Sequence, residues 1–250
     1  EPDSFKGHQL LDGGSFVVSI PDDKILLKHI RIPKNALIDE IINFELIQMH
    51  LDTPDKFIYD AIETAVESQY LGMILRKTTF DDSVAFFENQ NVNSRNTISA
   101  KMRSQALVEG FLTYCRHNGG ELGAIIDLST NNGSIGFYYK KKIIDLSHFS
   151  LLRYDFSDDQ SFARLSVELK TLLNFKKESF QELGISIPLS GLYLVGDSID
   201  ENKIEALQNM LKVNVKRPEI NKGYFSHRDE TAGITIDKYL IALGLTVYNS

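Results

Sequence analysis

The stretch Gly123-Ala-Ile-Ile-Asp-Leu-Ser-Thr-Asn-Asn-Gly-Ser-Ile-Gly-Phe-Tyr-Tyr139 decides the fold. Its apolar beginning predicts a buried strand that ends at Asp127, and its second half predicts another strand over residues 134–139. The small polar residues between them predict a turn. Three lysines at residues 140–142 follow where a second turn would fall, and we interpret them as its solvated tip. The next apolar segment, residues 143–149, completes an antiparallel meander.

Helix and strand patterns continue to alternate after the meander. A long helix is predicted from about Asp159, and Asp200 is expected to cap a second helix that ends at Leu211. Between them, residues 192–195 form a short continuous apolar run of the kind that is buried in a mixed sheet. Residues 213–216 predict another strand, and residues 237–247 are apolar enough for a terminal helix. The apolar stripe of the long helix consists of Phe162, Leu165, Leu169, Leu172 and Leu173.

The residues before the opening stretch also alternate. Strands are predicted at residues 16–20, 24–32, 57–66, 70–75 and 98–102. Asn35 is expected to cap one helix, and Thr79 to cap a shorter one with Asp81 and Asp82 in its first turn. A further helix is predicted over residues 104–116, and the break at Asn118-Gly-Gly suggests a domain boundary between residues 1–117 and 118–250. This order of elements predicts an α/β fold with α+β character in two lobes.

Composition bounds the class of protein. With 250 residues, 42% hydrophobic and 24% charged, the chain can form one or two globular domains with a sizeable core. Its net charge of −7 argues against nucleic-acid binding, which needs a concentrated basic surface. The single cysteine, Cys115, excludes an internal disulfide and suits a reducing compartment. No apolar run approaches the ~20 residues that span a bilayer, and the six histidines lack zinc-binding spacing.

Several motifs occur in the same order as in a known family. His29-Ile-Arg-Ile-Pro33 is followed by a predicted helix that carries Glu45, and then by the extended segment Phe57-Ile-Tyr-Asp60. Met102-Arg-Ser-Gln-Ala-Leu107 is similar to the family motif D-x-(E/Q)-A-L, without its Asp. On these residues the chain resembles the type IV pilus assembly protein PilM and its relatives GspL and MshI.

Four more segments extend this resemblance over most of the chain from Phe16 onward. They are Ile126-Asp-Leu-Ser-Thr-Asn-Asn-Gly133 for the phosphate hairpin, Leu165-Ser-Val-Glu-Leu-Lys-Thr-Leu-Leu173 for a helix, Leu194-Val-Gly-Asp197 for the adenosine turn and Ala242-Leu-Gly-Leu-Thr246 for the closing motif. The resemblance implies an actin-like ATPase fold of the ribonuclease H-like type. It also implies a small SHS2-like subdomain inserted at about residues 22–100.

The nucleotide-binding elements of that family are reduced in this chain. Ser129 stands where the hairpin motif has glycine, and Asp197 replaces the second glycine of the adenosine turn. Side chains at these positions would crowd the approach of phosphate groups to the backbone. The first phosphate loop has no counterpart before Phe16, since residues 12–15 are interpreted as a linker, and the segment available for a nucleotide-clasping insertion is too short. The resemblance therefore predicts a pseudo-ATPase without a cofactor, and disfavours ATP and magnesium.

The degenerate nucleotide site implied by the resemblance comprises Asp127, Ser129, Gly133 and Gly196. Asp127 is the best catalytic candidate, since in a nucleotide site it would bind the metal ion through a water molecule. The alternative interpretation is a strand-end residue that satisfies turn amides through Thr130 or Asn131. We expect no catalytic residue and no metal ligand, and we interpret the paired carboxylates at residues 81–82 and 158–159 as helix-start charges.

The resemblance implies a non-catalytic scaffold in a type IV pilus or type II secretion-like assembly platform. Such a module is cytoplasmic, peripheral to the bacterial inner membrane, and docks on the cytoplasmic tail of a bitopic partner of the PilN or GspM type. An assembly ATPase is a second implied partner, and self-association stays open. The predicted partner contacts are Glu45, Gln48, Met49 and Tyr59, on a sheet edge or groove of the smaller lobe. Met49 is also a candidate gap-filler of the core.

An active actin-like ATPase, with ATP-dependent partner binding or polymerisation, is the alternative function. An N-terminal segment that is not part of this sequence could complete its nucleotide site. Some members of the family carry a transmembrane helix after this module. We therefore expect that the natural chain can extend beyond either end.

Overall fold

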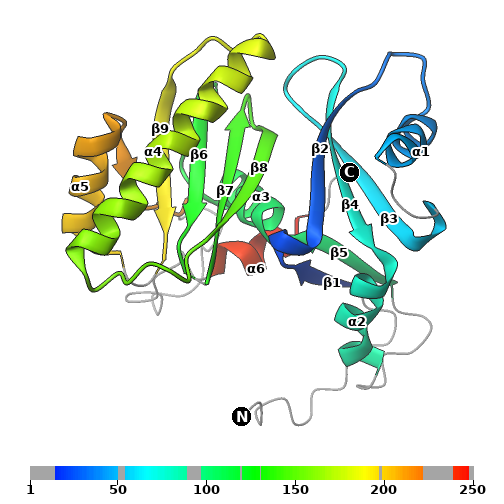
Figure 1. Cartoon of the computed structure of the whole chain (residues 1–250), viewed down its shortest axis with the longest axis horizontal. Coiled ribbons are helices and arrows are strands. Elements are labelled where there is room, and N and C mark those ends of the chain that lie inside the picture. The colour runs from blue at the N-terminus through cyan, green and yellow to red at the C-terminus, as the bar shows by residue number, and fades with distance from the viewer. Residues whose placement is uncertain are drawn as a thin grey trace.

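The meander predicted around Asp127 is confirmed in a computed structural model of the chain (Figure 1). Strands β6 (Leu122–Asp127), β7 (Asn132–Tyr139) and β8 (Lys142–Ser150) run antiparallel to their neighbours in the meander. Lys140 and Lys141 form the exposed turn between β7 and β8, and both have positive φ, as tight hairpin turns require. The structure describes residues 15–49, 54–88, 97–118, 120–129, 131–196, 199–221 and 239–247.

These strands belong to a five-stranded mixed sheet in the order β10-β9-β6-β7-β8. Strand β9 (Leu189–Val195) runs parallel to β6, and β10 (Val215–Lys216) runs parallel to β9. Helices α4 (Asp159–Glu182) and α5 (Glu201–Leu211) cover one face of this sheet. Helices α3 (Arg103–Tyr114) and α6 (Leu240–Leu245) lie on the other face (Figure 1). The sheet is therefore the middle of three layers.

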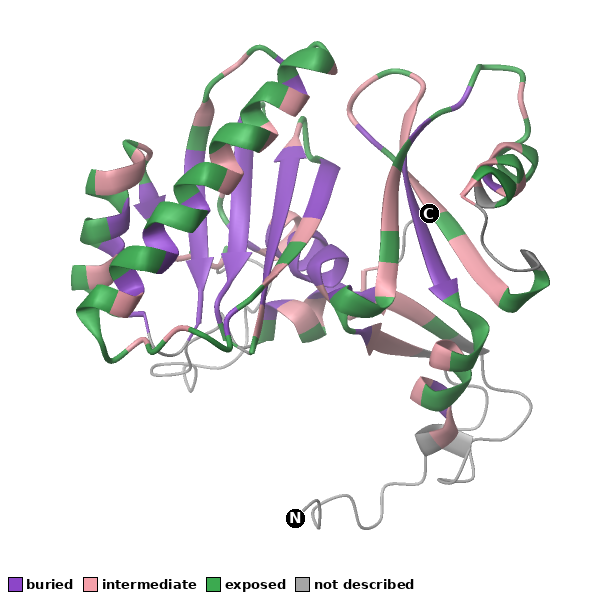
Figure 2. Ribbon diagram, viewed as in Figure 1, coloured by how far each residue is buried: buried purple, intermediate pink, exposed green. Residues whose placement is uncertain are grey.

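Alternate residues of β6 enter different cores, because side chains alternate between the two faces of a strand. Ala124 and Ile126 pack with α4 and α5, whereas Ile125 packs with α3. All residues of β6 are buried (Figure 2). A strand covered on both faces has a continuous apolar run instead of an alternating one, which is the pattern of the opening stretch.

Two smaller sheets occupy the N-terminal part of the chain (Figure 1). Strand β1 (Ser15–Ile20) pairs in parallel with β5 (Thr97–Met102). The chain between them forms a three-stranded antiparallel sheet in the order β2-β4-β3. Its elements are η1 (Asp22–Lys24), β2 (Ile25–Arg31), α1 (Ile38–Gln48), η2 (Pro54–Lys56), β3 (Phe57–Glu63), β4 (Gln69–Arg76) and α2 (Lys77–Glu88). The three-stranded sheet is thus an insertion between two paired strands.

Helix α3 connects the insertion-bearing part to the five-stranded sheet. It follows β5 directly, and Leu107, Val108 and Phe111 are completely buried in the core that α3 shares with that sheet. The boundary predicted at residue 118 therefore follows a helix whose core side chains belong with the C-terminal sheet. The domain limits themselves stay predictions.

Two predicted helix starts are wrong. Helix α1 begins at Ile38 without a side-chain cap, because Asn35 lies inside a turn closed by the bond from the Ala36 amide to the Pro33 carbonyl. Helix α2 begins at Lys77, directly after β4, so Thr79 lies within it and residues 81–82 lie beyond its first turn. At both places the preceding turn or strand fixes where the helix begins, and this outweighs the preference for a capping side chain. The terminal helix is observed as Leu240–Leu245, and residues 237–238 lie outside the described part.

Candidate functional site

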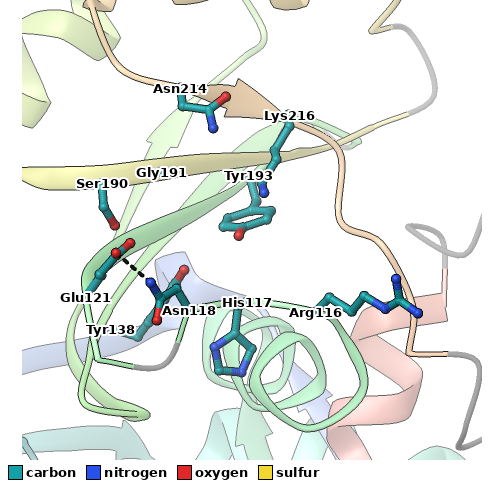
Figure 3. A pocket seen from close by; sticks show the side chains of 10 residues that line it. All are labelled: Arg116, His117, Asn118, Glu121, Tyr138, Ser190, Gly191, Tyr193, Asn214 and Lys216. Atoms are coloured by element: carbon teal, nitrogen blue, oxygen red, sulfur yellow. Dashed lines mark hydrogen bonds between the residues drawn. The ribbon is translucent and has the colours of Figure 1, made fainter.

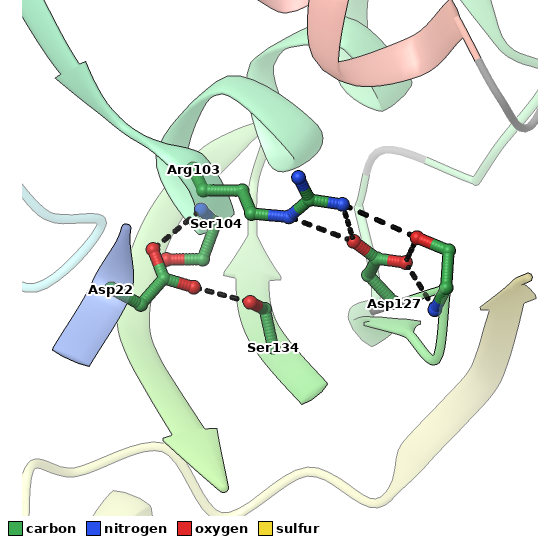
Figure 4. A network of polar contacts seen from close by, with 6 residues as sticks. Asp22, Arg103, Ser104, Asp127 and Ser134 are labelled. Atoms are coloured by element: carbon green, nitrogen blue, oxygen red, sulfur yellow. Dashed lines mark hydrogen bonds and ion pairs between the residues drawn. The ribbon is translucent and has the colours of Figure 1, made fainter. Parts of the chain in front are cut away.

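Asp127 lies at the carboxyl end of β6 within a network of hydrogen bonds (Figure 4). Its carboxylate is completely buried. Oδ2 accepts hydrogen bonds from Nε and Nη2 of Arg103, at 3.1 and 2.7 Å. Oδ1 accepts hydrogen bonds from the amide of Ser129, at 2.9 Å, and from its hydroxyl. Two protein residues therefore supply four donors to one carboxylate.

These contacts use the acceptor capacity of Asp127, because the two oxygens of a carboxylate offer about four lone-pair sites. The guanidinium of Arg103 also supplies the compensating positive charge, and two N–H groups of one guanidinium are a strong, charge-assisted arrangement. A metal ion or a metal-bound water could reach this carboxylate only by displacing Arg103 or Ser129. The residues present therefore do not fit a magnesium–nucleotide complex.

Ser129 holds the turn that follows β6. Besides its two bonds to Asp127, its hydroxyl accepts a hydrogen bond from Nη2 of Arg103 at 3.2 Å. The alternative interpretation of Asp127 expects a bond from a turn amide, and the structure has that bond with Ser129, rather than Asn131, as the donor. Thr130, the other expected donor, lies outside the described residues. The side chain at the position of the motif's glycine thus folds back onto the acid.

A second buried carboxylate, Asp22, lies next to this network (Figure 4). It accepts hydrogen bonds from the Ser104 amide, at 2.9 Å, and from the Ser134 hydroxyl. Ser104 is in the first turn of α3, and Met102 at the cap position provides no side-chain bond, so Asp22 caps this helix from elsewhere in the chain. Burial raises the pKa of Asp22 above its ordinary value, although the hydrogen bonds from Ser134 and Ser104 act in the opposite direction.

A cavity of about 390 Å³ opens beside the two carboxylates. It lies where β1 ends, where α3 begins and where the turn enters β7. Its lining consists of Ser19, Pro21, Asp22, Arg103, Asn131, Asn132 and Ser134. In open α/β sheets, ligands bind beyond the carboxyl ends of the strands. A phosphate site in this kind of fold is therefore expected at this cavity. Arg103 is one of the residues that line it.

The two glycines of the predicted site are explained by the close approach of protein groups. A Cβ at Gly133 would lie 2.5 Å from the ring of Phe149 on β8. Gly196 follows β9 with a φ of +150°, and a Cβ there would lie 3.2 Å from the backbone of Leu128. Both positions favour glycine for these reasons without any bound phosphate. Asp197, predicted to crowd the adenosine turn, lies outside the described residues.

Sequence reasoning missed Arg103 and Asp22. A signal for Arg103 was present in the family motif D-x-(E/Q)-A-L. When Gln105-Ala-Leu107 is aligned with the last three positions of the motif, Arg103 falls at the position of its Asp. A basic residue in place of one acid predicts an ion pair with the remaining acid instead of a shared metal. Asp22 had no such signal, since it meets Ser104 and Ser134 only after the chain has folded.

The predicted partner contacts all lie in or beside the three-stranded sheet. Glu45 forms an ion pair with Lys28 of β2, and Met49 is half-buried against the core beneath α1. Gln48 is exposed. Tyr59 lines a depression of about 510 Å³ between α1 and β3. The other lining residues are Ala36, Leu37, Ile38, Asp39, Ile42, Asp60 and Ala61.

Helix α1 carries apolar residues on two sides. Ile42 is buried against the sheet, whereas Leu37 before the helix and Phe44 and Ile47 within it are 65%, 55% and 62% exposed. A helix with apolar residues on its outer side offers surface that a partner can cover. Beside it, β3 is an edge strand in the order β2-β4-β3, so among the described strands its outer edge is open. This corner combines an apolar wall with an unpaired strand edge.

Comparison with known proteins yields structural rather than sequence matches. No protein-family model and no characterised protein sequence matches the chain. A PilM–PilN type IV pilus biogenesis complex is similar over 92% of this chain and 78% of that chain, with 15% identity and a TM-score of 0.66. The cytoplasmic domain of EpsL, an inner-membrane component of the type II secretion system of Vibrio cholerae, is similar over 94% and 76%, with 10% identity and a TM-score of 0.50.

The chain has an actin-like fold. The predicted fold class is confirmed by this similarity and by the mixed α/β architecture. No helix in the described part of the chain combines the length and the apolar character needed to cross a bilayer. Among the same residues, no group of three or more His, Cys, Asp or Glu side chains is placed to hold a metal ion.

Proposed function

We propose that this actin-like chain is a non-catalytic scaffold in a type IV pilus or type II secretion-like assembly platform. It works on the cytoplasmic side of a bacterial inner membrane and binds the cytoplasmic tail of a PilN-type or GspM-type membrane protein. The similarity to a PilM–PilN complex and to the cytoplasmic domain of EpsL supports this class of role. Because one fold hosts many functions, the proposal rests on the site as well.

The bond between Arg103 and Asp127 carries the non-catalytic part of the proposal. A carboxylate at this strand end would serve the metal of a nucleotide in an active actin-like ATPase. In this chain a guanidinium supplies the positive charge, and Ser129 takes the remaining acceptor sites. The carboxylate then fixes the start of α3 against the end of β6. We therefore propose no cofactor for this site.

The depression between α1 and β3 is the proposed seat of the membrane protein's tail. The open edge of β3 can pair with an extended peptide through backbone hydrogen bonds. Leu37 and Tyr59 offer apolar surface to side chains of such a peptide, and Asp39 and Asp60 lie beside them. These acids favour a tail with basic residues, because complementary charge steers and orients a partner.

Calorimetry with magnesium and a non-hydrolysable ATP analogue tests the non-catalytic part. We expect no binding at about 1 mM nucleotide, where a usable site would be well occupied. Micromolar binding that is lost in Asp127→Asn would overturn the proposal.

A matched variant sharpens this test. Arg103→Asp restores the acid of the family motif and puts two carboxylates side by side, which favours a bound cation. Magnesium at a few millimolar should therefore raise the melting temperature of Arg103→Asp and leave the parent chain unchanged. Stabilisation of the parent by magnesium and nucleotide would contradict the proposed role of Arg103.

Fluorescence anisotropy with a labelled PilN-type tail peptide tests the partner site. Tyr59→Asp should weaken binding at least about tenfold, because it puts a charge into the apolar lining of the depression. The matched control is Leu152→Asp, which changes a 72% exposed apolar residue elsewhere in the molecule. Loss of affinity in the control, or none in Tyr59→Asp, would show that the tail binds elsewhere.

A further inference from the structure

A second polar cavity lies at the end of β6 opposite to Asp127 (Figure 3). It is formed where β6 and β9 begin, between β10 and the residues that follow α3, and we call it the amino-end pocket. Its volume is about 430 Å³, which is within the range of roughly 300–1,000 Å³ that small-molecule sites span. The length of β6, at about 3.3 Å per residue, separates it from the Asp127 network.

His117 lines this pocket, and its ring has an unused hydrogen-bond acceptor. Its Nε2 lies 3.0 Å from the carbonyl oxygen of Leu112, and because a carbonyl can only accept, Nε2 is the protonated nitrogen. In the neutral ring Nδ1 is then an acceptor. This atom is buried and has no hydrogen-bond partner in the described chain. A buried acceptor without a donor is unfavourable, so the arrangement calls for a donor from outside.

The pocket is positively charged although the chain as a whole is acidic. Lys216 of β10 and Arg116 after α3 lie in its lining, and neither forms an ion pair with a carboxylate among the described residues. The ammonium of Lys216 lies 5.1 Å from the centre of the Tyr193 ring and points into the space between β10 and α3 (Figure 3). Glu121, the one carboxylate among the described lining residues, accepts a hydrogen bond from Asn118 at 2.6 Å.

Two buried tyrosines form a fixed floor beneath these charges. Tyr138 and Tyr193 are 2% and 4% exposed, and both rings pack against Phe111, with ring centres 5.5 and 4.4 Å away. Burial raises the pKa of Tyr138, and its contact with Tyr193 adds to the effect, so its hydroxyl stays protonated at neutral pH. The hydroxyl of Tyr138 therefore adds no negative charge to the pocket.

We propose that the amino-end pocket binds a small hydroxylated anion, a molecule of the size of a sugar phosphate or a sugar acid. Lys216, with Arg116 beside it, receives the phosphate or carboxylate group. A hydroxyl group of the ligand donates its hydrogen bond to Nδ1 of His117 and satisfies the buried acceptor. The site shares no residue with the Asp127 network or with the α1–β3 depression, so it goes beyond the scaffold role and does not depend on it.

Ligand-detected NMR on the full chain, followed by titration, tests the proposal with defined probes. Glucose 6-phosphate and gluconate carry both an anionic group and hydroxyl groups. Phosphate and acetate carry an anionic group without the sugar hydroxyls, and glucose carries the hydroxyls without an anionic group. We expect one of the two hydroxylated anions to bind at about 1 mM or tighter, at least about tenfold better than its simple counterpart and than glucose. The tighter of the two identifies a phosphate or a carboxylate as the anionic group.

Two variants assign the contacts. Lys216→Met keeps the length of the side chain without its charge, and should weaken the bound probe about tenfold. His117→Phe keeps the aromatic packing without Nδ1, and should reduce the preference of the hydroxylated probe over the simple anion to near unity. Lys34→Met, an exposed lysine paired with Glu67 in the three-stranded part, is the matched control and should bind like the parent.

The imidazole nitrogen signals of His117, assigned by their absence in His117→Phe, provide a direct readout. The probe should shift the Nδ1 signal, because that atom gains a hydrogen bond. Absence of binding at about 10 mM of every probe would overturn the proposal. So would equal affinity for a hydroxylated anion and its simple counterpart, or binding that neither variant alters.

Discussion

At the carboxyl end of β6, Asp127 receives four hydrogen bonds from Arg103 and Ser129, whereas at the amino end His117 keeps a buried acceptor without a described partner. The first end also has its charges neutralised within the chain. At the second end, Lys216 faces a pocket whose one carboxylate among the described lining residues, Glu121, is hydrogen-bonded to Asn118 instead. The two ends of one strand therefore have opposite electrostatic states.

This difference separates structural from binding roles. Satisfied charges hold elements together and leave little for a ligand, while unsatisfied ones weaken the fold slightly and are available for recognition. Substitutions should therefore have opposite consequences at the two ends. They should destabilise the protein at the Asp127 end. At the amino-end pocket they should weaken or alter ligand binding and leave stability almost unchanged.

Arg103→Met should produce the largest loss of stability. It leaves the buried carboxylate of Asp127 without its charge partner, and breaking such a pair costs about 3–5 kcal/mol. Because the Arg103 side chain is 27% exposed, we expect the lower part of that range. Urea unfolding followed by circular dichroism measures the change. The double variant Arg103→Met, Asp127→Asn should recover at least half of the loss, and no recovery would show that the two charges are not coupled.

Asp22→Ala should have the next largest effect, about 1–2 kcal/mol of destabilisation, because it removes the cap of α3. Asp22→Asn keeps the acceptor for Ser104 and serves as the matched control. Thermal melts of both variants and the parent measure the difference. Equal losses in Ala and Asn would mean that the charge of Asp22, rather than its hydrogen bond, stabilises the helix start.

The variant Asp22→Asn also tests how stability depends on pH. Burial raises the pKa of Asp22 in the folded state, so the native protein binds more protons than the unfolded chain just above the ordinary Asp pKa. The contribution of Asp22 to stability is thus fully present below the unfolded pKa and is lost as pH rises through the folded one. Relative to the parent, Asp22→Asn should become more stable as the pH rises above the ordinary Asp pKa of about 4, and an opposite trend would contradict the raised pKa.

His117→Phe should change stability by about 1 kcal/mol or less, with a gain as the expected sign. The variant removes an unsatisfied buried acceptor and keeps the ring contacts with Phe111 and Tyr138, although it loses the bond to the Leu112 carbonyl. Urea unfolding without any ligand measures this. A loss as large as that of Arg103→Met would mean that both ends of β6 are structural.

Lys216→Met should have the smallest effect on folding, within the error of a thermal melt, because the side chain is exposed and forms no ion pair among the described residues. Its effect should appear only in the binding of the hydroxylated anion. A clear fall in melting temperature would assign Lys216 to the packing over Tyr193 instead.

The sequence predicted the elements whose signals are local. The meander around Asp127, the buried run in β9 and the helix capped by Asp200 follow from apolar runs, turn residues and caps that lie close together along the chain. The helix starts at Asn35 and Thr79 were wrong where a turn or a preceding strand fixed the entry instead. A capping preference decides a helix start only where the adjoining turn or strand leaves that residue at the start of the helix.

By itself, the sequence determined a mixed α/β fold and the reduced state of the glycine positions, because strand patterns and side-chain size are properties of neighbouring residues. Only the tertiary structure decided which group satisfies Asp127, that Asp22 caps α3, and that His117 and Lys216 share a pocket. Those residues lie far apart along the chain and come together only when β5, β6 and β10 reach their places around α3. That assembly sets which charges are buried and which groups lie close enough to pair.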